Sequence, residues 1–170
     1  MKKQIIASAI AMTMVAGSAM AQHGDVKFFG NVSEITCDVT PSVDGSISDL
    51  VQLGTVSPKK EGEAKKIILK AKDISGGNCA SLAGKTASIA WTGNLTSEGI
   101  GAQGGLAQDA YVILAPANGN DSEVIKASHN TAEFDADKLA TEGFKFTAKL
   151  KGGDTAGDFQ SAAAYAVTYK

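Results

Sequence analysis

Several short segments of the chain alternate apolar and polar side chains, and this two-residue period restricts the fold more than any other feature. The clearest run covers 144–151, where Phe144, Phe146, Ala148 and Leu150 alternate with Lys145, Thr147, Lys149 and Lys151. Successive side chains of a β-strand point to opposite faces, so the run predicts a strand with one buried face. Related patterns predict strands at 25–33, 66–72, 86–92 and 110–115, a weaker strand over 50–56, and a last strand with Phe159, Ala163, Tyr165, Val167 and Tyr169 on one face.

The segments between these predicted strands are rich in turn-forming residues. Gly, Pro, Asn, Asp and Ser gather at 41–45, 75–78, 96–105, 117–121 and 152–157, and only 135–141 has a helical character. Within 86–92 we expect Ala87, Ile89 and Trp91 to face inward and Ser88 outward. Short strands joined by Gly-rich turns predict an all-β antiparallel sandwich, and 170 residues fit one domain.

The N-terminal segment is typical of a targeting signal. Lys2 and Lys3 precede a short apolar stretch over 5–15, and the small-x-small sequence Ala19-Met20-Ala21 follows. The stretch is too short to span a membrane. We expect a signal peptide over 1–21 that is cleaved after Ala21, with 22–170 exported; the alternative is an N-terminal core helix.

Export gives the two cysteines a structural meaning. In an oxidising compartment Cys37 and Cys79 can form one disulfide, which is the only pairing available. The chain-entropy model values the closure of such a loop at roughly 4 kcal/mol. The alternative is a catalytic or redox thiol, but the chain contains no C-x-x-C sequence.

Motifs for chemistry or for nucleic-acid binding are missing from the sequence. The Lys and Arg count of 16 consists of lysine alone, and the formal net charge is -2, which disfavours nucleic-acid binding. His23 and His129 lie in no recognisable metal or nucleophile motif and are predicted to be solvated. Asp135 and Asp137 lie in a polar connection, and the Gly-rich 101–105 segment lacks the Lys-Ser/Thr of a phosphate loop and is expected to be flexible. We predict no enzyme, cofactor, metal or small-molecule substrate.

The two ends of the chain carry the most specific patterns. Residues 24–32 read Gly-Asp-Val-Lys-Phe-Phe-Gly-Asn-Val, and Cys37 follows five residues later. At the other end Tyr169 is the penultimate residue, Gly157 is fourteenth from the end, and 143–148 read Gly-Phe-Lys-Phe-Thr-Ala. Together with the signal peptide and the cysteine spacing, the set resembles the major pilin subunits of enterobacterial chaperone–usher fimbriae over essentially the whole chain.

This resemblance implies an incomplete immunoglobulin-like β-sandwich that lacks its last strand and is completed by donor-strand exchange. It divides the exported chain into a donor segment at 22–33, which runs into the first strand, and a pilin domain at 34–170. The implied donor residues are Val26, Phe28, Gly30 and Val32, and those of the groove edge and chaperone contact are Gly157, Tyr165, Val167, Tyr169 and Lys170. The alternative for 24–32 is the first strand of its own sheet, and both roles are compatible.

The resemblance also implies a function and a set of partners. The chain would pass through the periplasm to the cell surface and polymerise head to tail into a fimbria that supports adhesion to host cells. Its partners would be further copies of itself, a periplasmic chaperone, an outer-membrane usher and a tip adhesin. The alternative function is a minor or tip subunit that itself binds a host glycan through exposed loops such as 94–109.

Overall fold

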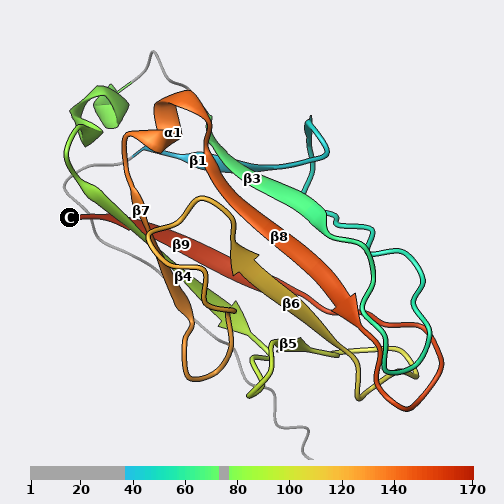
Figure 1. Cartoon of the computed structure of the whole chain (residues 1–170). Helices are drawn as coiled ribbons and strands as arrows, with labels where there is room; N and C mark the ends of the chain where they lie inside the picture. Colours follow the sequence, from blue (N-terminus) through green and yellow to red (C-terminus); the bar gives the residue numbers. More distant parts are fainter. Residues whose placement is uncertain (1–36, 73–76) are drawn as a thin grey trace, which may run out of the picture.

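The computed structural model describes residues 37–72 and 77–170, which form two antiparallel β-sheets (Figure 1). The strands are β1 (Val39–Val43), β2 (Ser46–Ile47), β3 (Lys65–Ala71), β4 (Thr86–Gly93), β5 (Ile100–Gly101), β6 (Tyr111–Pro116), β7 (Thr131–Asp135), β8 (Phe144–Lys151) and β9 (Ala163–Tyr169). One sheet has the order β2-β1-β3-β8-β6-β5, and the other has the order β7-β4-β9. A 3-10 helix η1 (Gly77–Leu82) and a short α-helix α1 (Lys138–Thr141) complete the described elements.

The two sheets pack face to face through an aromatic core. Phe134 of β7 lies 5.0 Å from Phe144 and 5.3 Å from Phe146 of β8, measured between ring centroids. Trp91 of β4 meets Phe146 edge to face at 5.2 Å. These contacts join strands of both sheets, so the predicted all-β sandwich is confirmed.

Most of the strands predicted from alternation are present. β8 covers the whole of 144–151, and its side chains alternate between buried and half-buried positions. β3, β4 and β6 match the predicted runs at 66–72, 86–92 and 110–115 to within one residue at each end, and β9 matches the last predicted strand. The strand predicted at 25–33 and the signal peptide at 1–21 lie outside the described residues.

Four local expectations are wrong. The segment 50–56 belongs to neither sheet in the described part of the chain, although Val51 and Leu53 pack against the core. Phe159 lies before β9. The helical stretch expected over 135–141 begins only at Lys138, and Asp135 is the last residue of β7. Ser88 is 7% exposed, because β4 is the middle strand of its sheet and Ser88 lies between Glu133 and Thr168.

Two predicted surface features are more ordered than expected. The side chain of His129 is 27% exposed, with its ring nitrogens 3.6 Å from Glu123 Oε2 and 3.8 Å from Asp121 Oδ1. The Gly-rich 101–105 segment begins in β5 and is held by hydrogen bonds to Gln160 rather than being a free loop. Asp135 and Asp137 are exposed, as predicted.

Across 37–72 and 77–170, no helix combines the length and apolar character needed to cross a membrane.

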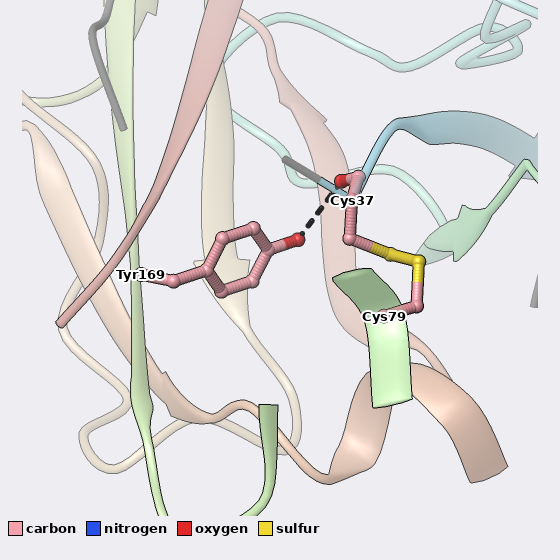
Figure 2. The surroundings of a disulfide bond; sticks show 3 residues. All are labelled: Cys37, Cys79 and Tyr169. Carbon is pink, nitrogen blue, oxygen red and sulfur yellow. Dashed lines mark hydrogen bonds between the residues drawn. A yellow bond between two sulfur atoms is a disulfide. The ribbon is translucent and has the colours of Figure 1, made fainter. Parts of the chain in front are cut away.

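The predicted disulfide joins Cys37, just before β1, to Cys79 in η1 (Figure 2). The two Cα atoms are 5.0 Å apart, and both cysteines are buried in the main core cluster. The bond ties the start of the described chain to the connection between β3 and β4. The structural disulfide is therefore confirmed.

Replacing both Cys37 and Cys79 by Ser should lower the free energy of unfolding by about 2–5 kcal/mol, because the unfolded chain loses a covalent loop constraint. Urea unfolding of the two forms without reductant measures the loss, with a copy of the predicted donor segment 22–33 appended after Lys170 of each form to give a stable monomer. Dithiothreitol should reproduce it in the native sequence and leave the double variant unchanged. Equal unfolding midpoints for the two forms would contradict the stabilising role.

Candidate functional site

Strand β9 forms an edge of its sheet in the described part of the chain. It pairs with β4 over its whole length, from Gly93 opposite Ala163 to Ala87 opposite Tyr169. The sheet order β7-β4-β9 ends at this strand (Figure 1). A strand at a sheet edge can accept a further strand along its second side.

The direction of the β9 backbone groups follows from its register. Thr86 and Lys170 exchange two hydrogen bonds, with N–H to O distances of 3.1 and 2.9 Å. Hydrogen-bonded pairs recur at every second residue of an antiparallel ladder, so residues 164, 166 and 168 direct their backbone groups to β4. The odd-numbered residues from 163 to 169 direct theirs to the other side.

An apolar pocket of about 530 Å³ lies between the sheets beside the first half of β9. Its floor is formed by core side chains of both sheets, including Leu69, Trp91, Leu114 and Ala148, which are buried. The strand residues that line it are Pro41, Val43, Ile67, Leu69, Trp91, Ile100, Val112, Leu114, Ala148, Ala163 and Tyr165. The pocket therefore opens a path from the edge of β9 into the hydrophobic core.

One wall of the pocket is the segment after β2. Leu50, Val51 and Leu53 line it, and the last two also pack against the core. Leu50 is 67% exposed, and the nearby Ile47 of β2 is 82% exposed. Leu50 therefore leaves a large apolar side chain exposed in this wall of the pocket.

A second wall of the pocket is the segment that leads into β9, with Phe159, Gln160, Ser161 and Ala162 in the lining. Gln160 O accepts hydrogen bonds from the backbone of Gln103 at 2.8 Å and of Gly104 at 3.1 Å. Ser161 Oγ donates to Gly101 O at 2.7 Å. These bonds hold the 101–105 segment against the approach to β9, so this wall is fixed independently of the strand ladder.

Gly157 lies in the same segment, six residues before β9, and is not part of the edge strand. A Cβ atom at this position would lie 2.5 Å from Leu106 Cβ, a distance that would force the two segments apart. Gly157 therefore allows a close approach of the chain beside the pocket.

Two tyrosines of β9 bind the backbone at and just before the start of β1. The hydroxyl of Tyr165 donates to Val39 O at 3.4 Å, and that of Tyr169 donates to Cys37 O at 3.1 Å (Figure 2). Burial raises the pKa of Tyr165. The pKa of Tyr169 is raised to about 12, mainly by burial and to a smaller extent by the negative charge of Asp38. The site thus has a closed end near the disulfide and an open end at the pocket.

The predicted site residues are brought together only in part. Tyr165, Val167 and Tyr169 lie on β9, and Lys170 follows it with Nζ 3.6 Å from Glu133 Oε1. The donor residues Val26, Phe28, Gly30 and Val32 lie outside the described residues. Among the described residues there is no group of three or more His, Cys, Asp or Glu side chains able to hold a metal ion.

Sequence reasoning did not assign the pocket residues themselves to the site. The alternation predicts that Trp91 faces inward, and it predicts the apolar residues of 50–56 only as part of a weak strand. The alternation within 50–56 is the sequence signal that could have pointed to Val51 and Leu53. These residues line the pocket, and their segment belongs to neither sheet in the described part of the chain.

The fold and the site define a class of protein, namely a disulfide-bonded β-sandwich with an apolar pocket beside an edge strand. Over 171 residues the chain is 57% identical to the "F107 fimbrial protein" of Escherichia coli, covering 100% of both sequences. It is 30% identical to the "K99 fimbrial protein" of Escherichia coli over 99% of each sequence. The chain belongs to the family of fimbrial proteins.

Two further comparisons describe more distant likeness. The "Major MR/P fimbria protein" of Proteus mirabilis (strain HI4320) is 29% identical, over 100% of this chain and 99% of that protein. The crystal structure of the P pilus rod subunit PapA aligns with 87% of this chain and 100% of its own, with a TM-score of 0.49 and 18% identity. No protein-family model matches the chain.

Family membership determines the class of function. The chain is a structural subunit of a surface fimbria rather than an enzyme. The predicted family, the structural role and the location at the cell surface are thereby confirmed.

The raised pKa of Tyr169 predicts a specific loss of stability in alkali. The folded chain keeps the phenol proton up to about pH 12, whereas the unfolded chain loses it near pH 10. This contribution to stability is full below about pH 10 and is lost as the pH rises through the folded value. Tyr169→Phe should lack this loss, and at pH 8 it should be less stable by about 0.5–1.5 kcal/mol because the bond to Cys37 O is missing.

Urea unfolding at intervals between pH 8 and pH 12 tests this prediction, in chains that carry a copy of residues 22–33 appended after Lys170. All other ionisable groups are common to both forms, so the difference between the two curves isolates Tyr169. Parallel curves over the whole range would show that the Tyr169 hydroxyl is not buried as described.

Proposed function

We propose that the chain is the major shaft subunit of its fimbria and polymerises head to tail by donor-strand complementation. In this proposal the domain at 34–170 is an immunoglobulin-like sandwich that lacks its last strand. The observation that supports it most is the coincidence of the edge strand β9 with an apolar pocket that reaches the core.

Strand addition would satisfy both features at once. An incoming strand would bond to the backbone groups that β9 directs away from β4, and its alternate side chains would fill the pocket. Donor-strand complementation of pilins is an established instance of this mode of binding. A ligand of another shape would cover the pocket and leave the strand edge exposed.

The proposed donor is the segment 22–33 of the next subunit, after removal of the signal peptide at 1–21. Val26, Phe28, Gly30 and Val32 share one face of its alternating pattern. An apolar face of this kind matches the lining of the pocket, where Leu69, Leu114 and Ala148 form much of the floor. Residues 22–33 would then continue into the first strand of their own subunit.

The segment 50–56 would form the second edge that receives the donor. Val51 and Leu53 alternate inward as in a strand, yet the segment has no place in either sheet of the described chain. A donor lying between this segment and β9 would give it a hydrogen-bonding neighbour. The weak strand predicted here from sequence would thus form only on assembly.

Before assembly, a periplasmic chaperone would occupy the same edge. Tyr165, Val167 and Tyr169 would lie along its strand, and the C-terminal carboxylate of Lys170 would bind basic residues of the chaperone. An outer-membrane usher would then exchange the chaperone for the donor of the next subunit. A separate tip adhesin would contact the host receptor.

A chain that carries its own donor tests the proposal. Appending a copy of residues 22–33 after Lys170 through a flexible linker should yield a stable monomer, because the added strand fills the pocket intramolecularly. The exported chain without the extension, purified without chaperone, should be unstable or polymerise. Size-exclusion chromatography and urea unfolding distinguish the forms. A reversible, stable monomer without the extension would overturn the incomplete fold.

Two variants of the appended copy provide matched controls. Gly30→Asn adds a side chain to the face that enters the pocket and should weaken closure about tenfold or more through overpacking. Asn31→Ala changes the opposite face and should have little effect. Equal effects of the two substitutions would contradict the assigned face of the donor.

A further inference from the structure

The strands of the two sheets carry charges of opposite sign. In the described chain, all the lysines that lie within strands belong to β3 and β8 of the six-stranded sheet, namely Lys65, Lys66, Lys70, Lys145, Lys149 and Lys151. The acidic residues within the described strands, Glu133 and Asp135, both belong to β7 of the other sheet. The described sandwich therefore has a basic side and an acidic side.

The register of the six-stranded sheet brings most of these lysines onto its outer face. The even-numbered residues of 144–150 are buried in the core, so the odd-numbered residues of β8 point outward. Lys66 of β3 lies opposite Thr147, and Lys149 lies opposite Ile113 of β6. The outer face over β3, β8 and β6, here called the basic face, carries Lys66, Lys70, Lys145, Lys149 and Lys151.

The basic face is only partly neutralised within the subunit. Among the described residues, only the carboxylates of Glu61 and Glu142 pair with its lysines. Glu61 is shared by two lysines of β8, at N–O distances of 3.6 and 3.7 Å. Lys66 and Lys70 are exposed and form no ion pair with another described residue. Five lysines against two carboxylates leave an excess of three positive charges.

The other sheet gathers acidic groups along β7. Glu133 and Asp135 alternate with the buried Phe134, so both point to the outer side of this sheet, and both are exposed. The segment before β7 lies beside it, because Asn120 N donates to Glu133 O at 2.7 Å. The acidic edge, as we call β7 with its flanking segments, carries Asp121, Glu123, Glu133, Asp135 and Asp137.

The acidic edge also keeps an excess of charge. Lys126, Lys138 and Lys170 each pair with one of its carboxylates, at N–O distances of 3.0, 3.4 and 3.6 Å. Asp121 and Asp137 have no lysine partner among the described residues. With histidine counted as neutral, five carboxylates against three lysines leave an excess of two negative charges.

Both charged surfaces lie away from the edge of β9. In the sheet order β7-β4-β9, strand β4 separates the acidic edge from β9. The basic face is on the outer side of the other sheet, whereas the pocket lies between the sheets. A contact through these two surfaces therefore leaves the edge of β9 and the pocket accessible.

We propose that the acidic edge of one copy of the chain binds the basic face of another copy, side by side. A second copy is the partner that the charges favour, because the excess of lysines on one surface matches the excess of carboxylates on the other. Each copy presents one surface of each kind, so the contact is heterologous and can repeat from copy to copy along a fimbria. It uses neither β9 nor the pocket and does not rest on the proposed function.

The fimbria makes such a contact effective. Exposed ion pairs are individually weak and are screened by salt, so separate subunits in dilute solution do not stay together through them. Copies held in one fimbria have a high effective concentration for one another, and a weak contact between them then forms. The charges also select which surfaces meet, because two basic faces repel each other.

Carbodiimide coupling of intact fimbriae tests the contact, because this reagent joins a lysine amine directly to a carboxylate without a spacer. Fimbriae purified from cells that express the subunit are coupled, digested and examined by mass spectrometry. We expect amide cross-links from Lys66 or Lys149 to Glu133 or Asp135. Such a link joins two subunits, because the sheets pack about 10 Å apart and these side chains point away from each other on opposite sides of the sandwich.

An ion pair within the subunit provides the internal control. Lys59 Nζ lies 2.6 Å from Asp154 Oδ1, and both side chains are exposed, so their cross-link shows that the reagent has reacted. If this link forms while Lys66 and Lys149 couple to no carboxylate of the acidic edge, the inference is wrong. Coupling of these two lysines only to carboxylates elsewhere on a neighbouring subunit also overturns it.

Charge reversal tests the attraction at a distance from the coupled atoms. Lys66→Glu should lower the coupling of Lys149 to the acidic edge about threefold, because the reversed charge repels that edge. Lys60→Glu changes an exposed lysine that belongs to neither sheet and should leave the coupling unchanged. Adding Glu133→Lys to Lys66→Glu should restore it. Equal losses in the two single variants, or no recovery in the double variant, would contradict the proposed contact.

Discussion

The antiparallel pairing of β4 with β9 is the contact on which the rest of the site depends. It places the last strand of the chain at the edge of a three-stranded sheet, with every second residue directed away from β4. It also sets Tyr165 beside Trp91. Without this register neither the edge position of β9 in the described part of the chain nor the aromatic side of the pocket would exist, because both are produced by the same ladder.

The two ends of β9 have different surroundings, so the two ends of the site differ in structure. Near its end, the Tyr169 hydroxyl binds Cys37 O, and the disulfide ties Cys37 to η1 (Figure 2). Near its start, the strand borders a pocket whose floor is the core itself. A subunit built this way is rigid where its strand is fastened and accessible where a further strand would add hydrogen bonds and apolar contacts.

Local patterns predicted the strands but not all of their partners. β8 was predictable because four apolar residues alternate without interruption, whereas β7 has only Ala132 and Phe134 as buried residues between polar neighbours. The strand predicted at 50–56 was wrong for the described chain because alternation reports which side chains are buried, not whether a neighbouring backbone is present. The Tyr169 bond to Cys37 O and the approach of Gly157 to Leu106 are tertiary contacts that no local pattern encodes.

The central claim is that the side of β9 that faces away from β4 pairs with a strand from another subunit. The most direct measurement is hydrogen exchange of the Ala163 and Tyr165 backbone amides in the chain that carries the appended copy of residues 22–33. These amides point away from β4. The account predicts that both are protected about as strongly as the Ala164 and Ala166 amides, which bond to β4. Fast exchange of the Ala163 and Tyr165 amides beside protected Ala164 and Ala166 amides would contradict strand addition at this edge.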